Sequence, residues 1–169
     1  MLPLHPRPHR GFTLIELMVT LAVLAMLLLA TVPLAADWTY SAQTRDAHSK
    51  LVRSYGTAKA LALRNPLGTQ AGTQAAGLRL QLDGSLVQLL VCMGDPADAS
   101  TCTPGNARVL ATAHYPSAVA TTLGGTLLAA GTALTVALDN RGALVPVSSS
   151  TAYTLTRGGS QNNETGTLQ

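Results

Sequence analysis

The chain has 169 residues, of which 47% are hydrophobic, 11% charged and 4% aromatic. This composition excludes an intrinsically disordered chain, because the apolar fraction is too high and the net charge of +3 too low. Without Arg7 and Arg10, which precede a long apolar run, the 11 basic residues fall to 9 against 8 acidic ones, so the remaining chain is nearly neutral and no acidic partner is implied.

The first predicted element is an apolar helix. Residues 5–10 hold two His and two Arg without an acid, and the apolar run that follows continues to Ala36. About 25 residues rich in Leu, Val, Ala, Met and Thr are enough to span a bilayer as a helix. Glu16 is the only charged residue in the run. An unpaired carboxylate there costs on the order of 1 to 3 kcal/mol, so we expect it to have a function.

The sequence around this glutamate, Gly11-Phe12-Thr13-Leu14-Ile15-Glu16, resembles the prepilin leader of type IV pilins and type II secretion pseudopilins. The resemblance implies that a membrane peptidase, which is also the methyltransferase, cuts between Gly11 and Phe12 and methylates the new amino group of Phe12. It also implies that Glu16 neutralises an amino terminus during assembly and that Pro33 bends the helix. A buried ion pair of this kind favours one packing register, although its net stabilisation is small.

Two other interpretations fit less well. A cleaved secretory signal has the same basic-then-apolar order, but this apolar run is longer than usual, and Leu34 spoils the small-x-small pattern before Asp37. A plain signal anchor fits the length but leaves Glu16 and the Gly11-Phe12 pair unexplained. The prepilin interpretation is therefore favoured.

The helix is predicted to continue through residues 37–65, which contain no Pro and one Gly. Apolar residues recur there at spacings of three and four, as an amphipathic helix requires. The stripe comprises Ala47, Leu51, Tyr55, Ala58 and Ala62, widened by Val52, Leu61 and Leu63. Asp46 and Lys50 have the spacing of a helical ion pair, and residues 65–68, Asn-Pro-Leu-Gly, form a stop signal. The helix from Phe12 to Arg64 would be about 80 Å long.

Residues 66–157 are predicted to form a small, mainly antiparallel β head packed on the second half of this helix. Strands are expected at residues 78–82, 86–91, 109–115, 134–138, 143–147 and 152–156, with turns at Asp83-Gly84 and at residues 139–142. Residues 117–132 have no clear pattern. Residues 158–169 read as a polar tail in which only Leu168 is core-forming. The fold class is thus α+β and pilin-like, with a leader at residues 1–11, a transmembrane half-helix at 12–36 and a periplasmic half-helix at 37–65.

Cys92 and Cys102 are the only two cysteines. In an oxidising periplasm we expect them to form a disulfide that staples a surface loop, worth roughly 2 to 3 kcal/mol. A metal site is a weak alternative, because Asp95 and Asp98 lie between them without a CxxC unit or a nearby His. No metal or cofactor is expected.

The helix end at residues 62–65 (Ala-Leu-Arg-Asn), the later cysteine-containing strand and residues 136–142 followed by Pro146 resemble the GspH/FimT group of minor pilins and pseudopilins. The resemblance implies a low-abundance subunit in the bacterial inner membrane, with one membrane span and a periplasmic head. Such a subunit helps initiate or cap a type II secretion pseudopilus or a type IV pilus, in protein secretion or pilus biogenesis. Its partners are other pilins through the N-terminal helix, the prepilin peptidase and the inner-membrane assembly platform.

A second hypothesis is a DNA-binding minor pilin for natural transformation, since some members of the group bind DNA through a C-terminal Gly-Arg-x-Arg motif. This sequence has no Arg after Arg157, and the head arginines at positions 79, 108, 141 and 157 are scattered. DNA attachment needs clustered basic residues, usually with stacking aromatics. DNA is therefore an unfavoured partner.

A third hypothesis is a membrane-anchored periplasmic enzyme. After the predicted cleavage only His48 and His114 are left as histidines, and no nucleophile elbow or phosphate loop is present. Turn chemistry explains Asp95, Asp98 and Asp139. No catalytic residue is proposed.

Overall fold

The structure is a computed structural model that describes residues 11–146, 151–158 and 162–169; the side chains of residues 30–35 are not described. The chain divides into two compact units, one ending at Trp38 and the other running from Thr39 to Gln169. The second unit contains the head and includes the segment that the sequence predicted to be a polar tail. The fold is α+β and pilin-like, as expected.

One helix, α1, runs from Leu14 to Arg64. It ends where the sequence predicted, because Asn65 adopts a left-handed backbone conformation with φ of 45°. The Asn65 side chain then closes the following loop. Its amide nitrogen donates to the carbonyl oxygen of Thr69 at 2.9 Å, and its oxygen accepts from the Thr69 backbone N–H at 2.8 Å. These two bonds satisfy the backbone N–H and C=O groups of Thr69 and so fix the loop that follows the helix.

The predicted stripe on the second half of α1 is buried. Ala47, Leu51, Ala58 and Ala62 are fully covered and Tyr55 is 4% exposed. The predicted widening of the stripe was correct for Leu61 and wrong for Val52 and Leu63, which are 44% and 57% exposed. At 3.6 residues per turn, these two lie roughly 100° and 120° from the middle of the stripe, beyond the width that the head covers.

The larger sheet has the order β3-β2-β1-β6-β7, with each neighbouring pair antiparallel. Its strands are β1 (Ala76–Asp83), β2 (Leu86–Met93), β3 (Val109–Pro116), β6 (Ala133–Leu138) and β7 (Leu144–Val145). The predicted hairpin and the predicted turn at residues 139–142 are both present, and a cis peptide bond joins Val145 to Pro146. On β6 the residues Leu134, Val136 and Leu138 are buried in alternation, as expected.

A second sheet was not predicted. Its order is β5-β4-β8-β9, and its strands are β4 (Ala120–Leu123), β5 (Thr126–Leu127), β8 (Ala152–Thr156) and β9 (Asn163–Thr167). It takes in part of the unassigned segment 117–132 and residues 163–167 of the predicted tail. The interpretation of residues 158–169 as a tail was wrong, because β9 pairs with β8 along its length and Leu168 is 3% exposed.

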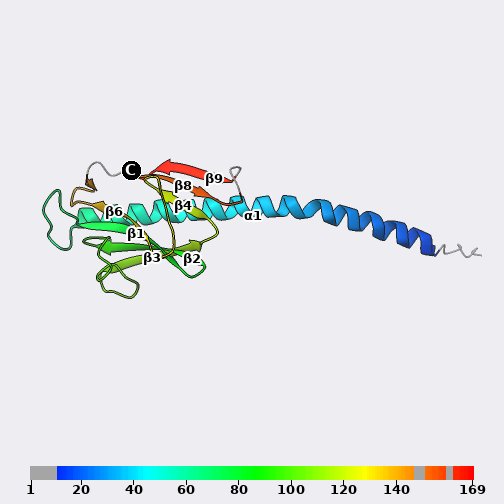
Figure 1. Ribbon diagram of the computed structural model, residues 1–169, viewed down its shortest axis with the longest axis horizontal. Helices are drawn as coiled ribbons and strands as arrows, with labels where there is room; N and C mark the ends of the chain where they lie inside the picture. The colour runs from blue at the N-terminus through cyan, green and yellow to red at the C-terminus, as the bar shows by residue number, and fades with distance from the viewer. Residues whose placement is uncertain (1–10, 147–150, 159–161) are drawn as a thin grey trace, which may run out of the picture. The chain divides into compact units, whose positions relative to one another are not determined.

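One hydrophobic cluster joins the second half of α1 to both sheets. It contains the helix stripe, the inward side chains of β1, β2, β3 and β6, and residues of the second sheet such as Leu123, Leu155 and Leu168. In Figure 1 the strands lie along the C-terminal part of α1. The second half of α1 is therefore held on the head by its buried side chains from Ala47 onward.

Candidate functional site at the start of the helix

The start of α1 is held by a cap. Gly11, Phe12 and Thr13 precede the first helical residue, and the Thr13 hydroxyl accepts a hydrogen bond from the backbone N–H of Glu16 at 3.3 Å. A threonine followed three residues later by a glutamate is the capping-box pattern, so this role was readable from the sequence and was missed. Gly11 and Phe12 therefore lie outside the helix, which begins at Leu14.

Glu16 lies in the first turn of α1. A carboxylate is favourable there, because the N-terminal end of a helix carries partial positive charge. Gly11, Phe12, Thr13 and Glu16 line one surface hollow. Among the described residues, no ion-pair or hydrogen-bond partner of the Glu16 carboxylate is present. The structure thus brings the predicted cleavage site and the predicted charge partner together at one surface hollow, with the Glu16 side chain exposed.

Large apolar side chains are exposed all around the first part of the helix. From Phe12 to Leu29 their exposed fractions lie between 52% and 84%. Apolar surface of this extent marks an interaction or membrane surface. Within the described part of the chain, no helical stretch has the length and apolar character that a membrane crossing requires. The transmembrane assignment of residues 12–36 stays a prediction, as does the bend at Pro33, whose side chain lies outside the described residues.

The loop between Cys92 and Cys102, called here the cysteine loop, covers part of the outer face of the large sheet. This is the face turned away from the helix. Cys92 and Cys102 form the expected disulfide, with 5.6 Å between their Cα atoms, and both are buried. The Arg79 guanidinium donates to the carbonyl oxygens of Pro96 and Ala97, both at 3.1 Å. Pro96 lies so close to Gly77 that a Cβ at that position would collide with its ring. A covalent bond, an arginine and a close backbone contact together hold this loop.

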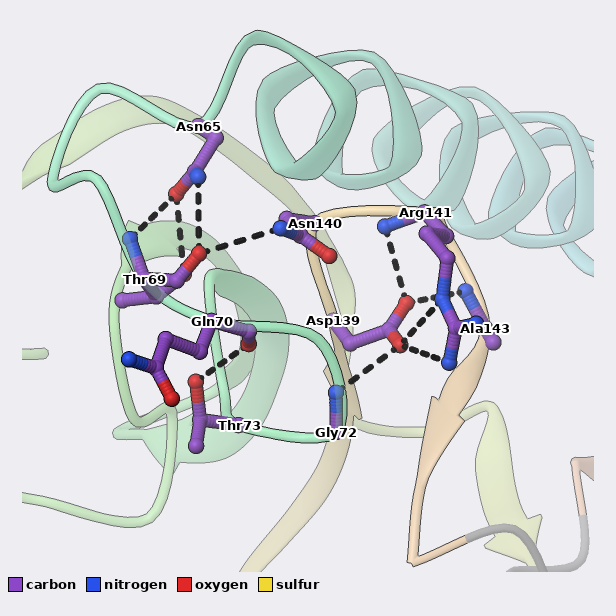
Figure 2. Close-up of polar contacts among 9 residues, drawn as sticks. All are labelled: Asn65, Thr69, Gln70, Gly72, Thr73, Asp139, Asn140, Arg141 and Ala143. Atoms are coloured by element: carbon purple, nitrogen blue, oxygen red, sulfur yellow. Dashed lines mark hydrogen bonds and ion pairs between the residues drawn. The ribbon is translucent and has the colours of Figure 1, made fainter.

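A cluster of polar side chains connects the turn between β6 and β7 to the loop after α1 (Figure 2). The Asp139 carboxylate, 1% exposed, accepts from the backbone N–H groups of Gly72, Arg141 and Ala143 at 3.2, 2.9 and 2.9 Å. Burial raises the pKa of Asp139, but these hydrogen bonds outweigh burial and lower the pKa from 3.8 to about 2. Asn140 adds a bond from its amide to the Thr69 carbonyl at 3.0 Å. The sequence predicted the turn but not this connection.

Three of the four head arginines are engaged within the chain. Arg79 holds the cysteine loop, Arg141 contacts Asp139 at 3.3 Å, and the Arg157 guanidinium lies 5.0 Å from the centre of the Tyr40 ring. Arg45 pairs weakly with Glu164 at 3.8 Å. Such residues are not a free basic patch of the kind that phosphate contacts need. In the described part of the chain, no group of three or more His, Cys, Asp or Glu is placed to hold a metal.

Comparison with known proteins supports the assignment of the N-terminal segment. A family model for the prokaryotic N-terminal methylation motif matches residues 6–32. The match spans Gly11, Phe12 and Glu16 and indicates a type IV prepilin-like protein. Proteins with this motif are generally structural, are processed by a prepilin peptidase and assemble in the manner of pilins. Comparison with curated proteins and with solved structures finds no match.

Proposed function

We propose that the chain is a minor pilin or pseudopilin that helps initiate or cap a type II secretion pseudopilus or a type IV pilus. The observation that carries the proposal is the start of α1, where a methylation motif, an exposed Glu16 without an ion-pair partner among the described residues, and an exposed apolar surface coincide. A helix that is apolar on all sides needs lipid or other helices around it. The head has a hydrophobic core of its own and needs neither lipid nor other helices around it.

Maturation then proceeds at the Gly11–Phe12 bond. The peptidase removes residues 1–11 and the amino group of Phe12 is methylated. Residues 12–36 are held as a single span in the inner membrane, and the head stays in the periplasm. During assembly this half of the helix moves from lipid into a bundle with other subunits, where the interactions are van der Waals contacts and the few polar pairs available.

Glu16 has the role of selecting the docking register. Cleavage creates an ammonium group at the edge of an apolar helix, and an unpaired carboxylate on a neighbouring subunit gains most by meeting it. Removing one partner of a buried ion pair costs about 3 to 5 kcal/mol, which is far more than the pair contributes in net stability. Misregistered docking is therefore strongly disfavoured, and correct docking is only mildly stabilised.

The test is replacement of this glutamate. Glu16→Ala should still be processed but should be incorporated poorly into filaments, measured by immunoblot of the sheared filament fraction against whole membranes. Asp46→Ala is the matched control, since Asp46 already has a partner within the chain, Lys50 at 2.7 Å, and its loss should leave incorporation unchanged. Wild-type incorporation of Glu16→Ala would refute the pairing role.

Gly11→Val tests the cut site itself. A branched side chain at this position should block processing, so the protein should keep the mass of the uncleaved chain in membrane extracts. Thr20→Val, a similar change inside the helix, should be processed normally. A normally shortened Gly11→Val product would place the cleavage elsewhere.

A further inference from the structure

The two sheets have four edge strands, and one of them is open. β5 and β7 are two residues long, and β9 carries Glu164. β3, by contrast, is eight residues long and contains no charged residue from Val109 to Pro116. Edge strands are normally kept from pairing with other chains by shortness, charge, proline or a covering segment. Figure 1 shows β3 as the outermost strand of the large sheet.

The register identifies which backbone groups of β3 face outward. The Ser117 N–H donates to the Ser85 carbonyl at 2.9 Å, which makes Ser85 and Ser117 a hydrogen-bonded pair. Because such pairs alternate along an antiparallel ladder, the pairs of Gln88 with His114 and of Leu90 with Thr112 are the non-bonded ones. The N–H and C=O groups of Thr112 and His114 therefore point away from β2. Among the described residues, no backbone partner satisfies them.

A row of side chains on the outer face leads to the same edge. The Arg79 Nε donates to the Gln81 oxygen at 3.1 Å, the Gln81 amide nitrogen to the Gln88 oxygen at 3.0 Å, and the Gln88 amide nitrogen lies 3.2 Å from His114 Nε2. Arginine can only donate, so the direction of the whole row is fixed. His114 Nε2 must accept, which places the ring proton on Nδ1. The row thus ends at β3 with a donor on an exposed side chain.

From these observations we infer that the β3 edge is an interface with a second copy of this chain, formed by antiparallel pairing of β3 with its two-fold mate. In the register centred on Ala113, Thr112 of one copy lies opposite His114 of the other. These are the residues whose backbone groups face outward, so each such pair exchanges two N–H···O bonds. The His114 donor then meets the Thr112 hydroxyl, which can accept. The edge is complementary to itself, as a two-fold interface requires.

Neighbouring registers fit less well. Shifting the centre to His114 would place Thr112 opposite Pro116, which has no N–H to donate. Shifting it to Thr112 would place His114 opposite Leu110, at the irregularity in the β2–β3 pairing. Only in the register centred on Ala113 does Thr112 of each copy lie opposite His114 of the other copy. The contact is short, so we expect a weak dimer.

The test is a cysteine at the proposed two-fold axis. Directly opposed Ala113 residues would form a non-bonded pair with Cα atoms about 4.5 Å apart, within the range of a disulfide. The chain has no free cysteine, so Ala113→Cys adds a single thiol, on the half-buried face of β3. Mild oxidation of the full-length protein in membranes should give a disulfide-linked species of twice the subunit mass on non-reducing gels. Thr165→Cys, exposed on the edge strand β9, is the matched control and should stay monomeric.

A second substitution separates edge pairing from random collision. Thr112→Lys in the Ala113→Cys background places a charge on the edge and should abolish the linked dimer. Thr135→Lys, on the exposed face of the interior strand β6, should not. Near-ultraviolet circular dichroism confirms that each variant is folded. Crosslinking equal to that of Thr165→Cys, or crosslinking insensitive to Thr112→Lys, would overturn the inference. So would a linked product containing a different protein, which would assign the edge to another partner.

Discussion

The two halves of α1 differ in how far their apolar side chains are buried. In the first half, from Phe12 to Leu29, the large apolar residues are more than half exposed. In the second half the stripe through Leu51 and Tyr55 is at most 4% exposed, because the head covers it. One continuous helix thus carries one apolar surface that its own chain covers and another that the described residues leave exposed. On the proposed function, the covered surface serves stability and the exposed one serves assembly.

The largest expected effect comes from comparing a leucine in each half. Leu51→Ala removes a fully buried side chain and should lower the free energy of unfolding of the head by about 2 to 5 kcal/mol. Leu24→Ala, 55% exposed in the first half, should change it by less than about 0.5 kcal/mol. Denaturation of the full chain in detergent, followed by near-ultraviolet circular dichroism of the buried tyrosines, measures both. Equal effects would erase the distinction between the halves.

A smaller loss of stability should show whether the head extends to the C-terminal residues. Leu168→Ala removes a buried side chain just after β9 and should destabilise the head by about 2 kcal/mol. Leu127→Ala, 57% exposed on β5, should leave stability nearly unchanged in the same measurement. If the two variants behave alike, the last residues are a tail after all and the head ends at β8.

A pH-dependent effect should arise in the head and not in the first half of α1. Asp139 has a pKa of about 2 in the folded protein, below its ordinary 3.8. Its stabilisation is therefore complete above about pH 4 and is lost as the pH falls through 2. The melting temperature of the wild type should fall over this window, and that of Asp139→Asn should fall less, because the amide lacks the carboxylate's charge and second acceptor. Asp83→Asn, exposed at the end of β1, should keep the wild-type profile.

The smallest effect concerns charge. Asp46 and Lys50 form an exposed ion pair of the helical spacing, 2.7 Å long, and such pairs contribute about 0.3 to 0.5 kcal/mol. Lys50→Ala should destabilise the head by no more than this and should lose its effect in high salt. A loss above about 1 kcal/mol would mean that the pair is part of a larger network on the second half of the helix.

Sequence patterns predicted what depends on neighbours along the chain. The helix end at Asn65, the β1–β2 hairpin and the alternation at Leu134 and Val136 are local, and the structure agrees with all three. The disulfide followed from two cysteines and an oxidising compartment. Thr13 was also readable as a cap and was overlooked.

What the sequence did not predict depends on partners far along the chain. Residues 120–123 become β4 because they pair with β8 and because Thr121 bonds the buried Tyr115 hydroxyl at 2.7 Å. The polar segment at 163–167 becomes β9 for the same kind of reason, since β8 needs a second neighbour and Leu168 completes the core. The connection from Asp139 to Gly72 and the row ending at His114 likewise join separate elements. Composition alone does not indicate such pairings.

Mass spectrometry of the mature N-terminus, from protein isolated from native membranes, tests the central claim most directly. The account predicts a peptide that begins at Phe12 and is heavier than its sequence by one methyl substitution. A chain beginning near Asp37 would contradict it, because the exposed half of α1 and Glu16 would then be absent from the mature protein. An uncleaved chain beginning at Met1 would also contradict it and would leave a simple anchor.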